Sequence, residues 1–176
     1  GFIQTTNNSG REAIFSYKAA DHIMDIDAIV REARKINPDI YIVSDAVQHM
    51  PHGVLDVAKL GLDGCNFAPY KAFGVRGCGF GYVSDRVAGL LHHKLLAKPE
   101  NEWELGTFPH PNYAAFSATV DYVCWLGRHF TDSDNRRTQY VTGMERIHLQ
   151  EHSLLDATIA ENITTSLADR DEEKLR

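Results

Sequence analysis

The stretch Ile40-Tyr41-Ile42-Val43-Ser44-Asp45-Ala46-Val47-Gln48 joins a run of apolar residues to an acid and an amide. Four β-branched or aromatic residues in succession predict a strand that is covered on both faces, as is typical of a parallel sheet. Asp45 and Gln48 then follow at the carboxyl end of this strand. Because ligands of open α/β sheets bind beyond the carboxyl ends of the strands, we expect both side chains to belong to a site.

The segment before this strand predicts a helix. Asp25 is a suitable N-cap, and Pro38 ends the helical pattern. The apolar residues between them recur at helical spacing, at Ile26, Ile29, Val30 and Ala33. Residues 1–5 predict a short strand that runs into a polar turn over residues 6–10.

The segment after the strand predicts further α/β elements. Residues 54–60 form a short predicted helix with Gly61 at its C-terminal end. Residues 63–68 and 78–83 form two more predicted strands. This alternation predicts an α/β sheet with parallel members. The connection around Lys71 is too short for a helical crossover, so we expect the last two strands to be antiparallel.

The second half of the chain is predicted to be helical. One helix covers residues 112–126, with Phe116, Val120 and Val123 on one face. A second helix covers about residues 137–159, with apolar anchors at Met144, Ile147, Leu154 and Leu155. Residues 169–176 are expected to be a solvated helix end or tail.

Length, charge and cysteine content limit the class of protein. The 176 residues are 43% hydrophobic, which suits one domain with a buried core. A net charge of -6 without a basic stripe disfavours nucleic acid or an anionic membrane as partner. No apolar run approaches the roughly 20 residues that span a bilayer. Three scattered cysteines indicate reduced thiols in a cytoplasmic compartment, and we expect all three to be buried.

Lys71 is the second candidate for chemistry. Most lysines are solvated, but this one lies between Phe67-Ala68-Pro69-Tyr70 and Ala72-Phe73-Gly74. A lysine amine can form an imine with an aldehyde, and a carboxylate such as Asp45 can keep a pyridine ring protonated. Together they predict pyridoxal 5'-phosphate as cofactor. Gln48 could donate a hydrogen bond to the phenolic oxygen of the ring.

Other motifs are weaker. Gly74, Gly77 and Gly79 resemble a nucleotide-binding loop, but they precede a strand rather than a helix. Close backbone packing beneath a cofactor is the better interpretation. No serine-nucleophile elbow is present. No metal site is expected, because no zinc-binding spacing occurs among the histidines considered, which are His49, His52, His92, His93 and His110.

In the order and spacing of its motifs the chain resembles the class V aminotransferase family of fold-type I pyridoxal-phosphate enzymes, which includes the cysteine desulfurases. The resemblance extends from about Gly1 to Asn162. Each motif is weak alone, and their common order makes the resemblance specific. The matching segments are Asn7-Asn8-Ser9-Gly10, Asp45-Ala46-Val47-Gln48, Asp56-Val57, Leu60-Gly61-Leu62-Asp63, Lys71 to Gly79, Gly106-Thr107 and Ile147 to His152.

The resemblance implies a fold and a division of the chain. Residues 1–135 would be part of the large cofactor-binding domain, a mostly parallel sheet flanked by helices. Residues 136–176 would be a linker helix toward a small C-terminal domain. The chain is then expected to be the central part of a longer homodimeric, cytoplasmic enzyme, and to be inactive by itself.

The resemblance also implies roles for residues. Lys71 would form the Schiff base and later move the α-proton of the substrate. Asp45 would pair with the pyridine nitrogen, and Gln48 and Asn7 would contact the ring hydroxyl. Thr107 would reach a phosphate, which in the family is that of the partner subunit.

Two positions depart from the family. Ala68 and Tyr70 stand where many members have serine and histidine on the phosphate, although a tyrosine hydroxyl can still donate to it. The family's nucleophilic cysteine lies in the small domain, so none of the three cysteines is assigned that role. The resemblance favours a desulfurase or lyase acting on an amino acid. An aminotransferase or epimerase, a non-catalytic relic of the fold, and remotely a nucleotide-binding domain stay open as alternatives.

Overall fold

The computed structural model describes residues 2–6, 12–16, 25–100, 102–107 and 109–174, with side chains for residues 25–100, 102–107 and 109–161. The chain divides into two compact units, Gly1–Asp121 and Tyr122–Arg176. Within the described residues, no helix is both long and apolar enough to cross a membrane.

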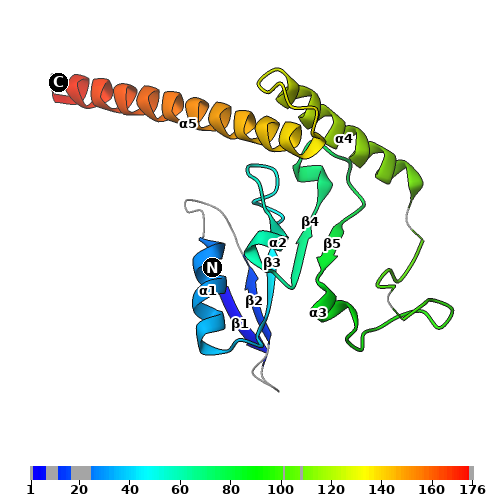
Figure 1. Ribbon diagram of the computed structural model, residues 1–176. Helices are drawn as coiled ribbons and strands as arrows, with labels where there is room; N and C mark the ends of the chain where they lie inside the picture. Colours follow the sequence, from blue (N-terminus) through cyan, green and yellow to red (C-terminus); the bar gives the residue numbers. More distant parts are fainter. Residues whose placement is uncertain (1, 7–11, 17–24, 101, 108, 175–176) are drawn as a thin grey trace. The chain divides into compact units, whose positions relative to one another are not determined.

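The first unit contains a five-stranded sheet whose strands follow one another in chain order (Figure 1). Its central pairings, β2 with β3 and β3 with β4, are parallel, and the two outer pairings are antiparallel. The expected antiparallel pair on either side of Lys71 is therefore confirmed. The strands are β1 (Phe2–Thr6), β2 (Glu12–Ser16), β3 (Tyr41–Asp45), β4 (Gly64–Phe67) and β5 (Phe80–Val83).

Two features of the sheet differ from the sequence prediction. Strand β2 was not foreseen, and it pairs with β1 as well as with β3. The parallel part is also confined to the middle three strands. The reason is that short connections at both edges of the sheet allow only antiparallel neighbours.

Helix α1 (Ile26–Ile36) forms as expected and packs against β3. The Asp25 carboxylate caps it by accepting a hydrogen bond from the Ala28 backbone N–H at 2.9 Å. Its apolar stripe places Val30 in a buried cluster with Ile42 of β3 and Leu62. This burial removes the apolar face of the helix from water and fixes it to the sheet.

Helix α2 (Val57–Leu60) is shorter than predicted. It begins after Asp56, whose side chain accepts from the Lys59 N–H at 3.0 Å, because a carboxylate is a better cap than the apolar residues before it. Gly61 ends the helix in the left-handed region at φ +66°, as expected. A Cβ at this position would also lie 2.7 Å from the Arg34 Nη1 atom.

Helix α4 (His110–Arg128) continues from the first unit into the second, where α5 (Arg136–Lys174) follows it. The two helices approach backbone to backbone within the second unit. A Cβ on Gly127 would lie 1.8 Å from the Gln139 carbonyl oxygen, and one on Gly143 would lie 2.2 Å from that of Val123. Glycine is therefore required at both positions.

The predicted apolar anchors of the last helix are correct only at its start. Met144 is buried, with 2% of its surface exposed, but Leu154 and Leu155 are 58% and 54% exposed. The contacts described between α5 and residues 122–133 involve only the first turns of α5. The helix also runs to Lys174, well beyond the predicted end near residue 159.

The three cysteines are free thiols. Cys65 and Cys124 are buried as expected, whereas Cys78 is only half-buried. Cys78 departs from the prediction because it lies in the loop before β5, outside the regular elements.

Candidate functional site

Asp45 and Lys71 lie at the carboxyl ends of two neighbouring parallel strands. Asp45 is the last residue of β3 and pairs in register with Asn66 of β4. Lys71 ends the 3₁₀ turn η1 (Pro69–Lys71), which begins two residues after β4. Parallel strands present their carboxyl ends at one edge of the sheet, so the fold brings both residues to the same edge.

The Asp45 carboxylate is half-buried, and its donors among the described residues are neutral. It accepts hydrogen bonds from the Val47 backbone N–H at 3.2 Å and from the Asn66 side-chain amide at 3.4 Å. Among the residues that the structure describes, no cation pairs with it. Because no described cation pairs with it, the Asp45 carboxylate stays available for a positively charged ligand group. Its charge also affects a neighbour, since burial and then the negative charge of Asp45 raise the pKa of the Cys65 thiol to about 11.

A tight turn after β3 holds Gln48. The backbone N–H groups of His49 and Met50 both donate to the Ala46 carbonyl oxygen, at 3.0 and 2.9 Å. Ala46 itself is buried and bonds through its N–H to the carbonyl oxygen of Asn66. Gln48 is half-buried in this turn and lies close in sequence to Asp45.

The turn that carries Lys71 is held by its own backbone. The N–H groups of Ala72 and Gly74 both donate to the Pro69 carbonyl oxygen, at 2.8 and 2.9 Å. A Cβ on Gly74 would lie 2.7 Å from that oxygen. Close packing therefore explains this glycine, as expected, but its neighbour is Pro69 of the lysine turn. Phe73, between Ala72 and Gly74, has φ +63°, a strained conformation for a residue with a side chain.

A second cation, Arg76, lies against the ring of Tyr70 in this turn. Tyr70 is 43% exposed. The Lys71 Nζ atom lies 5.8 Å from the centroid of its ring, and the Arg76 Cζ atom lies 5.3 Å from it. Gly77, at φ +90°, lets the chain turn just after Arg76. The sequence did not single out Arg76. Its signal was a cation inside the glycine-rich loop, five residues after the lysine.

An aromatic cluster supports the strands on either side of this loop. Phe67 of β4 and Phe80 of β5 stack with ring centroids 5.5 Å apart. Phe116 of α4 packs on both rings, at 5.5 and 4.5 Å, and Tyr113 meets Phe80 edge-on at 5.6 Å. Such ring pairs add to the free energy of burial. The cluster therefore fixes the chain ends from which η1 and the glycine-rich loop project.

Of the two remaining predicted site residues, Thr107 alone lies within the described residues. Asn7 lies outside the described residues. Thr107 is exposed on the loop before α4, and within the described part of the chain its side chain has no hydrogen bond to Asp45, Gln48 or Lys71. Its implied role on the phosphate of a partner subunit stays a prediction.

A buried acid, Asp63, joins β3 and β4 at the end opposite the site. Its Oδ2 atom accepts from Arg34 at 2.9 Å and from the Ile42 N–H at 3.0 Å. Its Oδ1 atom accepts from the Ser84 hydroxyl at 3.1 Å and from Arg86 at 3.2 Å. No role for Asp63 was predicted from the sequence, although an acid directly before a buried strand was a signal. These bonds link α1, β3 and the segments flanking β4 and β5.

Residues 20–162 match the family model described as aminotransferase class-V. Three curated relatives are each named a probable cysteine desulfurase. They are 31% identical over 68 residues in Mycoplasma genitalium, 31% over 64 residues in Ureaplasma parvum and 35% over 74 residues in Borreliella burgdorferi.

These relatives are much longer than the matched segments. The matches cover 39%, 36% and 42% of this chain but only 17%, 16% and 17% of the relatives. A solved structure named as a NifS-like protein has a TM-score of 0.51 at 22% identity, over 70% of this chain and 35% of that chain. It shows the fold, and confirms the predicted α/β fold class.

Proposed function

Because this chain belongs to the class V aminotransferase family, we propose that it is part of a pyridoxal-phosphate-dependent enzyme that acts on an amino acid through a Schiff base at Lys71. We favour desulfurase- or lyase-like chemistry, which the names of three relatives support. The observation that carries the proposal is the placement of Asp45 and Lys71 at adjacent parallel strand ends.

The residues at this edge suit the charges of pyridoxal phosphate. The cofactor has a pyridine nitrogen that is cationic when protonated and a phosphate that is anionic. Asp45 offers an anion that no described cation neutralises, and Lys71 and Arg76 place two cations around Tyr70. Asp45 would hold the ring nitrogen, Lys71 the aldehyde carbon and Tyr70 the phosphate, with Gln48 on the ring hydroxyl.

Each residue would then have a separate task. When bound, pyridoxal phosphate supplies an electron sink for the pair released at the substrate Cα. Asp45 keeps the pyridine nitrogen protonated. The Lys71 amine would accept and return the proton at Cα. Gln48 and Tyr70 orient the ring, which keeps the reacting bond in a productive geometry.

The rest of the proposal concerns the whole protein. Residues 1–135 would belong to the large domain, and residues 136–176 would be a linker helix toward a small domain. Asn7 would complete the site at the ring hydroxyl, and Thr107 would serve the phosphate site of a second copy in a cytoplasmic homodimer. Since the chain spans only a part of the relatives' length, these statements concern a longer enzyme.

Trapping the cofactor on its lysine tests the proposal. The 176-residue chain is incubated with pyridoxal phosphate, reduced with borohydride and digested, and the modified lysine is located by mass spectrometry. We expect the label on Lys71 in the wild type and in Lys59→Ala, a control that removes an exposed lysine of the same unit. The Lys71→Ala variant should lose it. Equal total labelling of Lys71→Ala and wild type would refute Lys71 as the attachment site.

The same experiment addresses the alternatives. The non-catalytic relic is favoured by Ala68 and by the exposure of Tyr70, since many family members have serine and histidine there. Labelling that is spread over several lysines of the wild type, without preference for Lys71, would support the non-catalytic relic. If Lys71 is labelled, assays of the longer parent with cysteine and other amino acids distinguish the reactions. Sulfide release would indicate a desulfurase, and keto-acid or D-amino-acid products would indicate an aminotransferase or an epimerase.

A further inference from the structure

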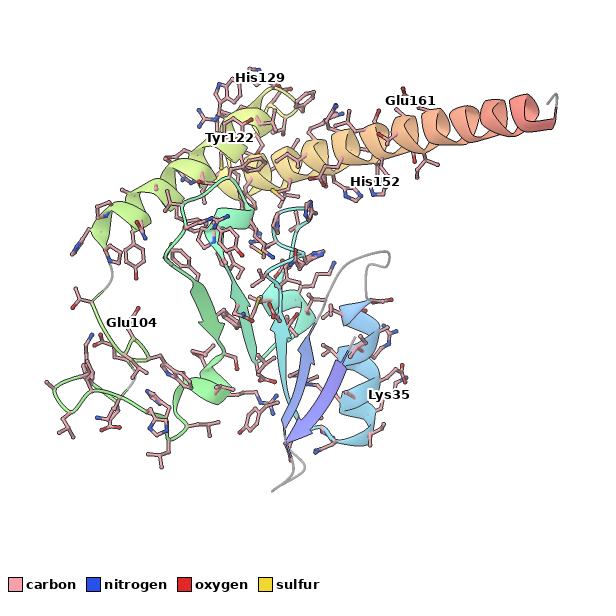
Figure 2. All side chains as sticks on the ribbon, turned by 180° about the vertical axis from the view of Figure 1, so that it is seen from behind. Lys35, Glu104, Tyr122, His129, His152 and Glu161 are labelled. Atoms are coloured by element: carbon pink, nitrogen blue, oxygen red, sulfur yellow. The ribbon has the colours of Figure 1, made fainter. Side chains whose placement is uncertain are left out.

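Two histidines form a pair on α5, far along the chain from the residues of the site. His148 and His152 are four residues apart, and their ring centroids lie 4.3 Å from each other with an interplanar angle of 69°. Residues at this spacing share one face of a helix. His152 is exposed and projects from the side of α5 (Figure 2), and His148 is half-buried. The pair was not among the histidines singled out in the sequence.

We propose that His148 and His152 bind one divalent late transition-metal ion, of the class Ni²⁺, Cu²⁺ or Zn²⁺. Neutral imidazole nitrogens are ligands that these ions prefer. The same i, i+4 spacing on a helix supplies the two zinc-binding histidines of the HExxH motif. Here the intervening residues are Leu149, Gln150 and Glu151, so only the ligand spacing is shared.

The surroundings of the pair leave its nitrogens accessible. Within the described part of the chain, neither ring has a hydrogen bond or ion pair with another protein group. The neighbouring cation, Arg146, lies with its guanidinium carbon 4.2 Å from the centroid of the Phe130 ring. The whole chain carries a net charge of -6, which favours the approach of a cation.

The site is open rather than closed. Among the described residues, no group of three or more histidine, cysteine or acidic side chains could hold a metal ion. Two imidazoles would therefore be completed by water, whereas structural zinc sites have four protein ligands. An ion held this way exchanges readily. It would also stabilise the helix, because the two rings have this separation only when residues 148–152 are helical.

A titration with Ni²⁺ alone tests the site, using a variant of unchanged composition. The double variant Gln150→His with His152→Gln keeps nine histidines but moves one to position i+2, on the other side of the helix. In a calorimetric titration of the full chain, we expect the tightest class of binding sites of the wild type to hold about one Ni²⁺ ion. The double variant should bind that ion at least about tenfold more weakly, because it loses the second contact of the chelate.

Two further variants test whether the effect is specific to this histidine pair. His129→Ala removes a histidine of the same unit that lies against Trp125, and it should bind Ni²⁺ as the wild type does. His148→Gln should reproduce the loss seen in the double variant, and it replaces that variant if circular dichroism shows that the latter does not fold. Ni²⁺ should raise the melting temperature of the helical signal in the wild type and in His129→Ala, but not in the double variant or in His148→Gln. Wild-type affinity in the double variant or in His148→Gln, or no tight class in the wild type, would overturn the proposal.

Discussion

Two acids that flank buried strands show how the surroundings of a residue decide its use. Asp63 is 1% exposed and accepts hydrogen bonds from two guanidinium groups, a hydroxyl and a backbone N–H. A charge that is buried must be paired, and this carboxylate is fully committed to the fold. Asp45 is only half-buried and is bonded to two neutral donors. Because no cation pairs with it in the described part of the chain, its charge is available to a ligand.

Replacing Asp63 with asparagine should destabilise the first unit. The substitution leaves Arg34 and Arg86 without their shared counter-charge, and hydrogen bonds to charged groups contribute roughly 1.5–3 kcal/mol each. Because both arginines are partly solvated, we expect Asp63→Asn to lose about 2–3 kcal/mol of unfolding free energy rather than the sum of the individual hydrogen-bond contributions. Urea denaturation measures the free energy of unfolding.

Asp27→Asn is the matched control. Asp27 forms an ion pair with Arg31 at 3.0 Å, but both side chains are more than half exposed. Such a pair contributes less than about 0.5 kcal/mol. Similar losses in the two variants would show that the Asp63 network does not hold the strands.

Because of the Cys65 thiol, the free energy of unfolding should fall as the pH rises through the alkaline range. Burial and the nearby Asp45 charge raise its pKa from 9.0 to about 11 in the folded chain. Its contribution to stability is fully present below pH 9.0 and is lost as the pH rises from there through about 11. The difference in unfolding free energy between wild type and Cys65→Ala should therefore shrink from about pH 8 to about pH 10.5. A constant difference across this range would contradict the assignment.

At the scale of elements, the lysine turn and the glycine-rich loop form one closely packed piece. Pro69 accepts two backbone hydrogen bonds and also packs against Gly74. The hydrogen bonds and close contacts that shape this piece therefore lie within residues 69–74, while the aromatic cluster of β4, β5 and α4 fixes its ends. The position of Lys71 depends on both.

A Cβ on Gly74 should disturb the lysine turn. Gly74→Ala places that atom 2.7 Å from the Pro69 carbonyl oxygen, a backbone atom that cannot move away by itself. We expect labelling of Lys71 by pyridoxal phosphate to fall by about tenfold, corresponding to a shift of about 1.4 kcal/mol. Gly79→Ala is the control, because its Cβ would meet the nearest oxygen at an ordinary 3.7 Å. Equal labelling of the two variants would show that the turn tolerates the added atom.

At the scale of the whole molecule, the chain consists of two units with separate means of stabilisation. The first is a sheet whose ends are set by Asp63 and by an aromatic cluster. The second is a helical unit in which Gly127 and Gly143 allow close backbone approach. The division falls inside α4, which is continuous through it.

Substitutions in the two units should therefore act independently. Gly143→Ala gains up to about 1 kcal/mol of helix propensity, but its Cβ would lie 2.2 Å from the Val123 carbonyl oxygen. Overpacking costs typically about 1–3 kcal/mol and outweighs that gain. In a double variant with Asp63→Asn, we expect the two losses in unfolding free energy to add within about 0.5 kcal/mol. A larger interaction term, measured by urea denaturation of the four proteins, would show that the units are coupled.

Local patterns in the sequence predicted most of the elements and two principal candidate site residues. The Asp25 cap, the stripe of α1, the left-handed Gly61 and the apolar strand before Asp45 are all read within a few residues. Asp45 and Lys71 were found because they follow strands, and parallel neighbours present such ends at one edge. These features depend on backbone sterics and hydrophobic periodicity, which act over short distances along the chain.

Only the tertiary structure decided which distant residues meet. Asp63 contacts arginines 29 and 23 residues away, and Arg76 returns to the ring of Tyr70. The pairing of β2 with β1 and β3, the exposure of Leu154 and Leu155, and the packing of Gly127 on Gln139 also depend on it. The physical reason is that burial and pairing of a side chain depend on elements whose approach is set by the whole packed unit. Sequence spacing alone does not encode that approach.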